Sequence, residues 1–439
     1  MLEKTESKMV ERALLVGAYT DTAAKSETES LLAELGELVD TLGIPIIERM
    51  LVFHREQHAK YLIGSGKAEE IAAHALEQKL DVIIFDNDLT PSQQRNWEKL
   101  APGIAVIDRQ EVILDIFGKR AQTREARLQV ELAKLEYSLP RLTRAWGHLA
   151  RQGGGIGGRG EGESQLEQDK RRIRKAIVRC KTELEEVHSS RATQRKDRQR
   201  TPVPNAAIVG YTNAGKSSLL HKLTGADVLI EDKLFATLDT TTRKIDLPNK
   251  QPLLLTDTVG FVRKLPHRLI EAFNATLEEA VIADFLIHLL DASQPEVMEF
   301  YNTTMKVLKE LGGETRQMLV VFNKIDKVED PTVLANLRRH FPEAQFISVH
   351  TGAGLESFVE RISEYASNGS AVYELRLPAS ASDVVARLHR AAKIVETEYL
   401  DDGVRIVALL SARLAAEYPQ YIVGRANERP GGRTQSLAG

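Results

Sequence analysis

The chain of 439 residues has little of what marks a secreted or membrane-spanning protein. It holds one cysteine, Cys180, so no intrachain disulfide framework can form. No apolar stretch approaches the roughly 20 residues that a membrane-spanning helix needs, and the N-terminus lacks the apolar centre of a signal peptide. We therefore expect a cytoplasmic, monomeric protein with no stable membrane insertion.

Net charge is also small over the whole chain, at only −3. The segment 119–200 differs, because it holds 21 Lys and Arg against 11 Asp and Glu, a net charge of +10 that leaves −13 for the rest. A basic block in an otherwise acidic protein is typical of a nucleic-acid contact. The alternative is a solvated helix surface whose basic residues are balanced by their neighbours.

A phosphate-binding loop, G-Y-T-N-A-G-K-S, follows the apolar run 206–209. Its two glycines let consecutive backbone N–H groups point at a β-phosphate, at the start of a helix, which already favours anions. Lys216 adds a charge for the β- and γ-phosphates, and Ser217 offers a hydroxyl to Mg²⁺. The predicted loop residues are Gly210, Tyr211, Thr212, Asn213, Ala214, Gly215, Lys216 and Ser217.

The motif D-T-V-G comes next, after the apolar residues 253–255. Asp257 would support the Mg²⁺ shell through a water molecule, and Gly260 leaves room for a backbone N–H to reach a γ-phosphate. The predicted residues of this motif are Asp257, Thr258, Val259 and Gly260.

The quartet N-K-I-D predicts that the base is guanine. The carboxylate of Asp326 can accept hydrogen bonds from N1–H and the 2-amino group of guanine, whereas adenine presents an acceptor and a bare carbon there. A buried charge left unpaired by adenine is costly, so discrimination should be large and the ligands should be GTP and GDP. The predicted base site is Asn323, Lys324, Ile325 and Asp326, with the loop Ser348, Val349 and His350 acting mainly through its backbone.

Two features of this GTP-binding pattern bear on catalysis. Phe261 follows D-T-V-G at the position where Ras-like GTPases carry the glutamine that orients the attacking water. We therefore assign no catalytic residue, and we expect slow intrinsic hydrolysis that depends on a partner. The first switch must lie within 235–243, where one threonine should complete the Mg²⁺ shell, and spacing alone does not say which.

The basic segment contains two successive stretches with apolar residues every three or four positions, the pattern of a coiled coil. The first runs from Leu128 to Leu149 and is interrupted by Pro140, where we expect a break. The second runs from Leu166 to Val187, so an antiparallel helical hairpin is the simplest structure.

Between the two stretches lies the segment 153–162, with seven glycines in ten residues, where a plain turn would need only two or three residues. Such a loop could press its backbone closely onto an RNA surface from which bulky side chains are excluded. The RNA-contact candidates are Arg151, Arg159, Arg171, Arg172 and Arg174.

The run 153–169, followed by Lys-Arg-Arg-Ile, resembles the hallmark of the HflX family of ribosome-associated GTPases. The resemblance covers nearly the whole chain, including residues 61–67 and 86–96, although Glu161 stands where the family usually has proline. It implies a GTPase that binds the large ribosomal subunit and its rRNA and that splits or rescues stalled ribosomes, often under stress. It also points to Thr237 as the Mg²⁺-binding threonine. The switch residues that match the family are Phe235, Ala236, Thr237, Leu238 and Asp239.

The N-terminal residues predict a small α/β domain. Apolar strands near 13–16, 81–85 and 104–108 are separated by helical patterns near 27–42, 67–79 and 91–100. This alternation indicates a parallel sheet with covering helices. The residues 64–67, Gly-Ser-Gly-Lys, form either a helix-start turn or a second nucleotide site, and the resemblance adds that ATP binding by this part has been suggested in relatives.

The predicted fold is therefore α/β and multidomain. Its parts are an N-terminal α/β domain (1–118), a basic helical hairpin (119–200), a P-loop GTPase domain (201–367), a small α+β domain (368–425) and a disordered tail (426–439). In the last domain we expect strands near 372–377, 393–399 and 404–408 and a helix at 382–391.

We interpret the chain as a GTP-hydrolysing switch that acts on the large ribosomal subunit. Two alternatives stay open. One is a GTP-regulated protein that acts on a protein partner such as a protease or a membrane complex, which would place part of it at a membrane. The other is ATP-driven RNA remodelling by the N-terminal domain.

Overall fold

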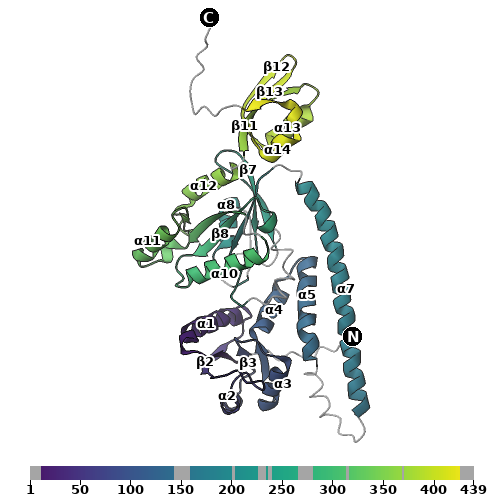
Figure 1. Cartoon of the computed structure of the whole chain (residues 1–439), viewed down its shortest axis with the longest axis vertical. Coiled ribbons are helices and arrows are strands. Elements are labelled where there is room, and N and C mark those ends of the chain that lie inside the picture. The colour runs from purple at the N-terminus through teal and green to yellow at the C-terminus, as the bar shows by residue number, and fades with distance from the viewer. Residues whose placement is uncertain are drawn as a thin grey trace. The chain divides into compact units, whose positions relative to one another are not determined.

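The computed structural model describes residues 11–142, 159–199, 203–225, 234–235, 240–264, 280–312, 316–367 and 370–425 (Figure 1). They fall into two compact units. The first takes its residues from Met1–Ser189, Leu229–Asp239 and Val259–Thr276, and the second from Ser190–Val228, Thr240–Thr258 and Leu277–Gly439. Outside the described residues lie Arg151, the side chain of Arg159, residues 153–158, Ala236, Thr237, Leu238, Asp239 and the tail 426–439, so the predictions for them stay predictions.

The first unit contains a parallel sheet in the order β2-β1-β3-β4. Its strands are β1 (Ala13–Tyr19), β2 (Ile46–Phe53), β3 (Val82–Phe85) and β4 (Ala105–Asp108). The helical elements are η1 (Thr22–Ala24), α1 (Lys25–Thr41), α2 (Ser65–Glu77), α3 (Pro91–Leu100) and α4 (Arg109–Arg120). The three predicted strands and three predicted helices are confirmed. Strand β2 was missed because Glu48 and Arg49 interrupt its apolar pattern, which suits a strand at the edge of a sheet.

The basic segment forms α5 (Arg124–Ser138) and α7 (Arg159–Gln199), which run antiparallel side by side (Figure 1). Leu128 of α5 is buried against Cys180 and Leu184 of α7, as the apolar seams predict. The break expected at Pro140 is confirmed, because the 3₁₀ turn η2 (Leu139–Arg141) follows α5. Helix α7 begins earlier than expected, so that residues 159–162 of the predicted loop are helical. The acidic residues at 161 and 163 favour a helix N-terminus there.

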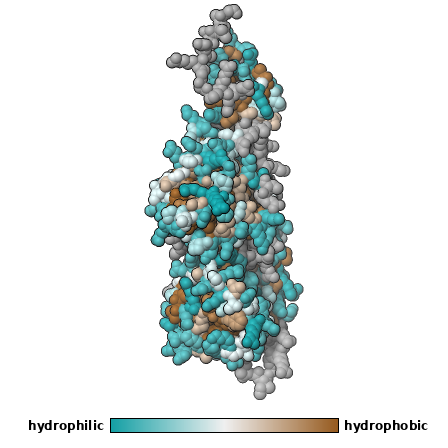
Figure 2. Space-filling view, turned by 60° about the vertical axis from the view of Figure 1, so that its left-hand side comes forward, coloured by the Kyte–Doolittle hydropathy of each residue, from teal (hydrophilic) through white to brown (hydrophobic). Residues whose placement is uncertain are grey.

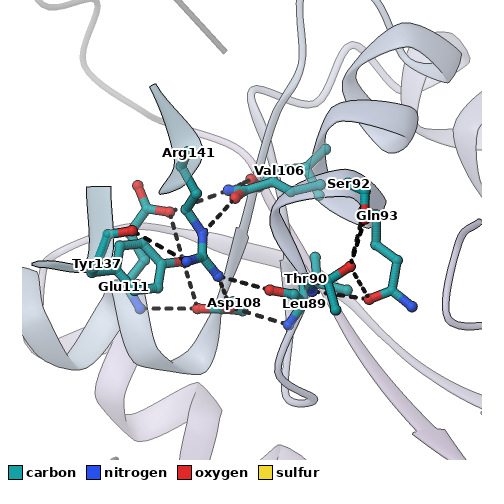
Figure 3. Close-up of polar contacts among 10 residues, drawn as sticks. Leu89, Thr90, Ser92, Gln93, Val106, Asp108, Glu111, Tyr137 and Arg141 are labelled. Carbon is teal, nitrogen blue, oxygen red and sulfur yellow. Dashed lines mark hydrogen bonds and ion pairs between the residues drawn. The ribbon is translucent and has the colours of Figure 1, made fainter. Parts of the chain in front are cut away.

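Buried polar contacts attach α5 to the sheet at the end of β4 (Figure 3). Asp108 accepts hydrogen bonds from the backbone N–H of Leu89 (3.1 Å) and from the hydroxyl of Tyr137 on α5 (2.9 Å). Arg141 donates to the side chain of Gln94 (3.0 Å) and to the carbonyl oxygen of Leu89 (2.7 Å). Burial raises the pKa of Asp108, although the hydrogen bonds that it accepts act in the opposite direction. The network fixes the base of the hairpin on the N-terminal sheet.

The second unit contains a sheet in the order β10-β9-β8-β5-β7-β6, parallel except that β6 runs antiparallel to β7. The strands are β5 (Asn205–Gly210), β6 (Thr241–Asp246), β7 (Pro252–Asp257), β8 (Phe285–Asp291), β9 (Gln317–Asn323) and β10 (Gln345–Phe346). The helical elements are α8 (Lys216–Thr224), α10 (Val297–Glu310), η3 (Ile325–Lys327), α11 (Pro331–His340) and α12 (Leu355–Ser367). The predicted P-loop GTPase fold is confirmed.

The chain continues into an antiparallel sheet in the order β12-β13-β11-β14. Its strands are β11 (Ser370–Pro378), β12 (Lys393–Leu400), β13 (Gly403–Ser411) and β14 (Ile422–Arg425), with α13 (Ser382–Ala391), α14 (Ala412–Glu417) and η4 (Pro419–Tyr421). Leu375, Leu388 and Ile406 lie in its core. The predicted strands and helix are confirmed, whereas α14 and the short β14 were missed.

Hydrophilic residues cover most of the described surface on the face in Figure 2, where hydrophobic patches are small and separate. Among the described helices, none combines the length and the apolar character that crossing a bilayer requires.

Candidate nucleotide site

The predicted phosphate-binding loop connects β5 to α8 and depends on two glycines with positive φ. Gly210 has a φ of +150°, and a Cβ there would collide with the carbonyl oxygen of Leu289. Gly215 has a φ of +97°, and a Cβ there would collide with the side-chain amide of Asn323. Both positions therefore require glycine. Since Gly215 is the N-cap of α8, the loop leads into a helix N-terminus, which favours anions.

Lys216 begins α8 and is only 6% exposed. Its ammonium donates to the carbonyl oxygen of Tyr211 at 2.7 Å, and the ring of Tyr211 stacks on Phe300 with centroids 4.0 Å apart. Burial lowers the pKa of Lys216 to about 8, while the nearby carboxylate of Asp257 acts in the opposite direction and the charge of Lys324 lowers the pKa further. An ammonium that has lost its hydration gains most from a negatively charged ligand, and a phosphate meets that need.

The hydroxyl of Ser217 donates to Oδ2 of Asp257 at 2.7 Å. Asp257 ends β7 and is fully buried, and the neighbouring Thr258 donates to the carbonyl oxygen of Ile208 at 2.7 Å. The Ser217 proton points to Asp257, and a hydroxyl oxygen that donates its proton can also act as a ligand of a cation. Hydroxyl and carboxylate oxygens are ligands that Mg²⁺ prefers, so this pair fits the predicted metal site.

Asn323 ties the phosphate loop to the predicted base site. Its Nδ2 donates to the carbonyl oxygen of Ala214 at 2.9 Å, and its Oδ1 accepts from the backbone N–H of Val349 at 3.1 Å. One side chain at the end of β9 thus fixes two loops of the predicted site. The structure therefore brings together the first and the third motif, which lie more than 100 residues apart in the chain.

Asp326 lies in η3, immediately after the end of β9. The hydroxyl of Ser348 donates to it and holds the pKa of Asp326 below its usual range. Asp326 is exposed, whereas Ser348 is buried at the start of the predicted base loop and His350 is exposed. An ionised, solvent-accessible carboxylate is what recognition of guanine N1–H and the 2-amino group requires.

Sequence reasoning missed Asp291. It ends β8 beside Asn323 of β9, and its Oδ2 lies 2.8 Å from the ammonium of Lys324. Its Oδ1 accepts from the backbone N–H (3.0 Å) and the hydroxyl (2.6 Å) of Ser293. Lys324 has a φ of +59°, so its backbone and its ammonium are both constrained. The sequence D-A-S at the end of an apolar strand was the available signal.

The switch residues that the structure describes belong to the first compact unit. Phe261 is 1% exposed and Val259 is also buried. The ring of Phe235 packs edge-on against Phe117 of α4, with centroids 4.5 Å apart. Phe261 carries no polar side-chain atom, so it can neither orient a water molecule nor transfer a proton.

Three of the RNA-contact candidates on α7 have side chains that the structure describes. Arg171, Arg172 and Arg174 are all exposed, and Arg172 lies 3.6 Å from Asp169. Among the carboxylates that the structure describes, none forms an ion pair with Arg171 or Arg174. Other basic residues of the hairpin pair across it, as Arg179 does with Glu131 at 3.3 Å. Among its described side chains, the basic segment therefore contains both paired residues and exposed arginines that have no described carboxylate partner.

Family models match the chain in succession. They are described as "GTP-binding GTPase N-terminal" (29–118), "GTP-binding GTPase Middle Region" (120–198) and "50S ribosome-binding GTPase" (205–324). A GTPase HflX from Akkermansia muciniphila is 49% identical, over 96% of this chain and 99% of its own length. The chain belongs to the HflX family of GTPases. GTPases HflX from Lacrimispora saccharolytica and Escherichia coli are 41% and 40% identical, over 95% and 94% of this chain and 97% of each relative.

Membership of the HflX family confirms the resemblance seen in the sequence and makes the chain a GTP hydrolase. In the residues 64–67, Gly64 is the N-cap of α2 and Lys67 pairs with Glu70 at 2.6 Å. The helix-start turn is therefore present. ATP binding at this place remains a prediction.

Proposed function

We propose that this HflX-family GTPase is a switch that binds the large ribosomal subunit in its GTP form and promotes the dissociation or rescue of stalled ribosomes. The observation that carries the proposal is the joining of a guanine-nucleotide site to a hairpin with exposed arginines, Arg171 and Arg174, that have no described carboxylate partner. A family model described as a 50S ribosome-binding GTPase matches residues 205–324 and supports the same partner.

The proposed nucleotide contacts follow from the geometry of the site. The N–H groups of the phosphate loop and Lys216 would hold the β- and γ-phosphates, and Asp326 would read guanine. Ser217 and Thr237 would hold Mg²⁺, whose contribution when bound is to neutralise charge on the phosphates. Gly260 would offer its N–H to the γ-phosphate, so that the switch segments sense whether GTP or GDP is bound.

Hydrolysis would depend on the ribosome, because Phe261 offers no group that could orient water. A ribosomal element would order the site or supply the missing group, and loss of the γ-phosphate would release the switch segments. The GTP form would then be the ribosome-bound form, and GDP the form that leaves.

The test is GTP turnover of the full chain alone, with large subunits and with small subunits. We expect large subunits to raise turnover about tenfold or more, within the range of partner-stimulated GTPases. The double variant Arg171→Glu/Arg174→Glu should lose most of this stimulation. Its matched control is Lys306→Glu/Lys309→Glu, which reverses two exposed lysines with the same spacing on α10.

Binding to large subunits should also weaken steeply between low and moderate salt, with a smaller slope for the arginine variant. Equal turnover with and without either subunit would contradict the proposal and favour a protein partner. ATP turnover that survives Lys216→Ala would favour RNA remodelling by the N-terminal domain.

A further inference from the structure

The N-terminal domain holds three charged side chains that the nucleotide site does not use, Glu34, Asp86 and Arg109, which we call the anionic socket. Arg109 is 1% exposed, and it donates from Nη2 to Oε1 of Glu34 and from Nη1 to Oδ1 of Asp86, both at 2.6 Å. One guanidinium thus serves one oxygen of each carboxylate. Two buried negative charges and one buried positive charge leave the anionic socket in need of a further cation.

Two cations from the segment after D-T-V-G complete the anionic socket. Arg263 donates from Nε to Oε2 of Glu34 at 2.7 Å and from Nη2 to Ser30 at 2.9 Å. Lys264 donates to Oδ2 of Asp86 at 2.6 Å. Each carboxylate is therefore shared between the buried guanidinium on one oxygen and a cation of this segment on the other. All of these residues belong to the first compact unit.

The same segment is directly linked to the nucleotide site. Arg263 follows Gly260 after two intervening residues, a reach of at most about 10 Å of extended chain. Those two residues, Phe261 and Val262, are both buried, which leaves little slack. Lys264 has a φ of +55°, a left-handed conformation that disfavours residues other than glycine, and such strain gathers in segments that switch. Movement of Gly260 toward a γ-phosphate would therefore reach the ion pairs.

We propose that the anionic socket is a binding site for the cations of residues 263–264, and that GTP acts against it. The anionic socket holds the segment while the γ-phosphate is absent, and GTP draws the segment away. Linkage makes this coupling reciprocal. The factor by which GTP, compared with GDP, weakens the ion pairs equals the factor by which breaking the ion pairs strengthens GTP binding relative to GDP binding. This inference rests on GTP binding and does not require the ribosome as partner.

The test measures dissociation constants of fluorescent GDP and of a non-hydrolysable GTP analogue for the full-length variants Lys264→Ala and Arg263→Met. We expect the GTP analogue to bind about fivefold more tightly or better, while GDP affinity changes much less. Lys264→Arg keeps the charge and should behave as the unaltered chain does. Lys250→Ala is the matched control, because Lys250 is also exposed with a φ of +60° and forms no ion pair with the described residues.

A second measurement needs no substitution. Hydrogen exchange at the backbone of residues 30–34 in α1 should be faster with the GTP analogue than with GDP, because the hydrogen bond to Ser30 and the ion pair to Glu34 are lost. Equal changes in GDP and GTP affinity, weaker binding of the GTP analogue, or identical exchange with both nucleotides would each overturn the proposal.

Discussion

Two buried cations in this chain have opposite surroundings. Lys216 donates to a backbone carbonyl oxygen, and burial lowers its pKa to about 8. Arg109 is held between two carboxylates that outnumber it. The first arrangement is a buried cation whose ammonium donates to an uncharged oxygen, and the second is two buried anions that share one buried cation. We propose that the first binds phosphate, and we infer that the second binds the basic segment that follows D-T-V-G.

The comparison indicates how a nucleotide at the phosphate loop can influence the first compact unit. The phosphate loop and the base site are built within the second compact unit, whereas the described switch residues belong to the first. Residues 259–264 therefore offer one route by which a ligand at the loop could act on the first unit. Each prediction below alters one part of the molecule and leaves the others unchanged.

The largest effect should come from Lys216→Ala, which removes the buried ammonium of the phosphate loop. We expect GTP turnover, measured as phosphate release, to fall about 100-fold or more, because the charge on the transferring phosphoryl group loses its partner. Thermal unfolding should not become easier, since an ammonium that is costly to bury has been removed. Turnover within threefold of the unaltered chain would contradict the assignment of this loop.

Asp326→Asn alters the part of the same site that is predicted to recognise guanine. We expect GTP affinity to fall about 100-fold, because an amide cannot accept from both guanine donors, and we expect xanthosine triphosphate to become the better ligand. Titration with both nucleotides checks the exchange of preference. If both affinities fell equally, Asp326 would be a structural residue and not the one that selects the base.

The pKa of Lys216 predicts opposite pH dependences for binding and for stability. Phosphate binds the charged ammonium, so GTP affinity should fall about tenfold from pH 7 to pH 9, as the pKa near 8 is passed. The ordinary pKa of 10.5 lies above the folded value, so the unfolded chain binds more protons between the two, and the nucleotide-free protein should gain stability from Lys216 as pH rises from about 8 to 10.5. Lys216→Met should remove both dependences.

Local motifs predicted most of the nucleotide site, because each motif carries its own backbone requirement. The two glycines of the phosphate loop and the N-K-I-D quartet could be placed without knowledge of the fold, since their spacing encodes a turn and a helix start. Helices and central strands of the sheets were equally visible as apolar periodicity. The edge strand β2 was not, because only one of its eight residues, Val52, is buried.

The contacts between distant residues could not be predicted in this way. Glu34 and Arg263 are 229 residues apart, and no periodic pattern relates them. The carboxylate of Asp86 lay inside a stretch that resembles the family, yet its partners, Arg109 and Lys264, depend on the packing of separate segments. Charged residues in a sequence look solvent-exposed until the fold shows that they are buried and paired.

The smallest effect, and the one that sharpens the comparison most, is expected for Asp291→Asn. Loss of the ion pair to Lys324, which is largely shielded from solvent, should weaken nucleotide binding about fivefold, or about 1 kcal/mol. The loss should be the same for GTP and GDP, because both carry the guanine that the N-K-I-D quartet is predicted to bind and only one carries a γ-phosphate. Asp246→Asn removes an exposed partner of Lys244 and should change neither affinity. A change in the ratio of GTP to GDP affinity with Asp291→Asn would mean that the base site also senses the γ-phosphate. Recognition of the base and recognition of the γ-phosphate would then not be independent.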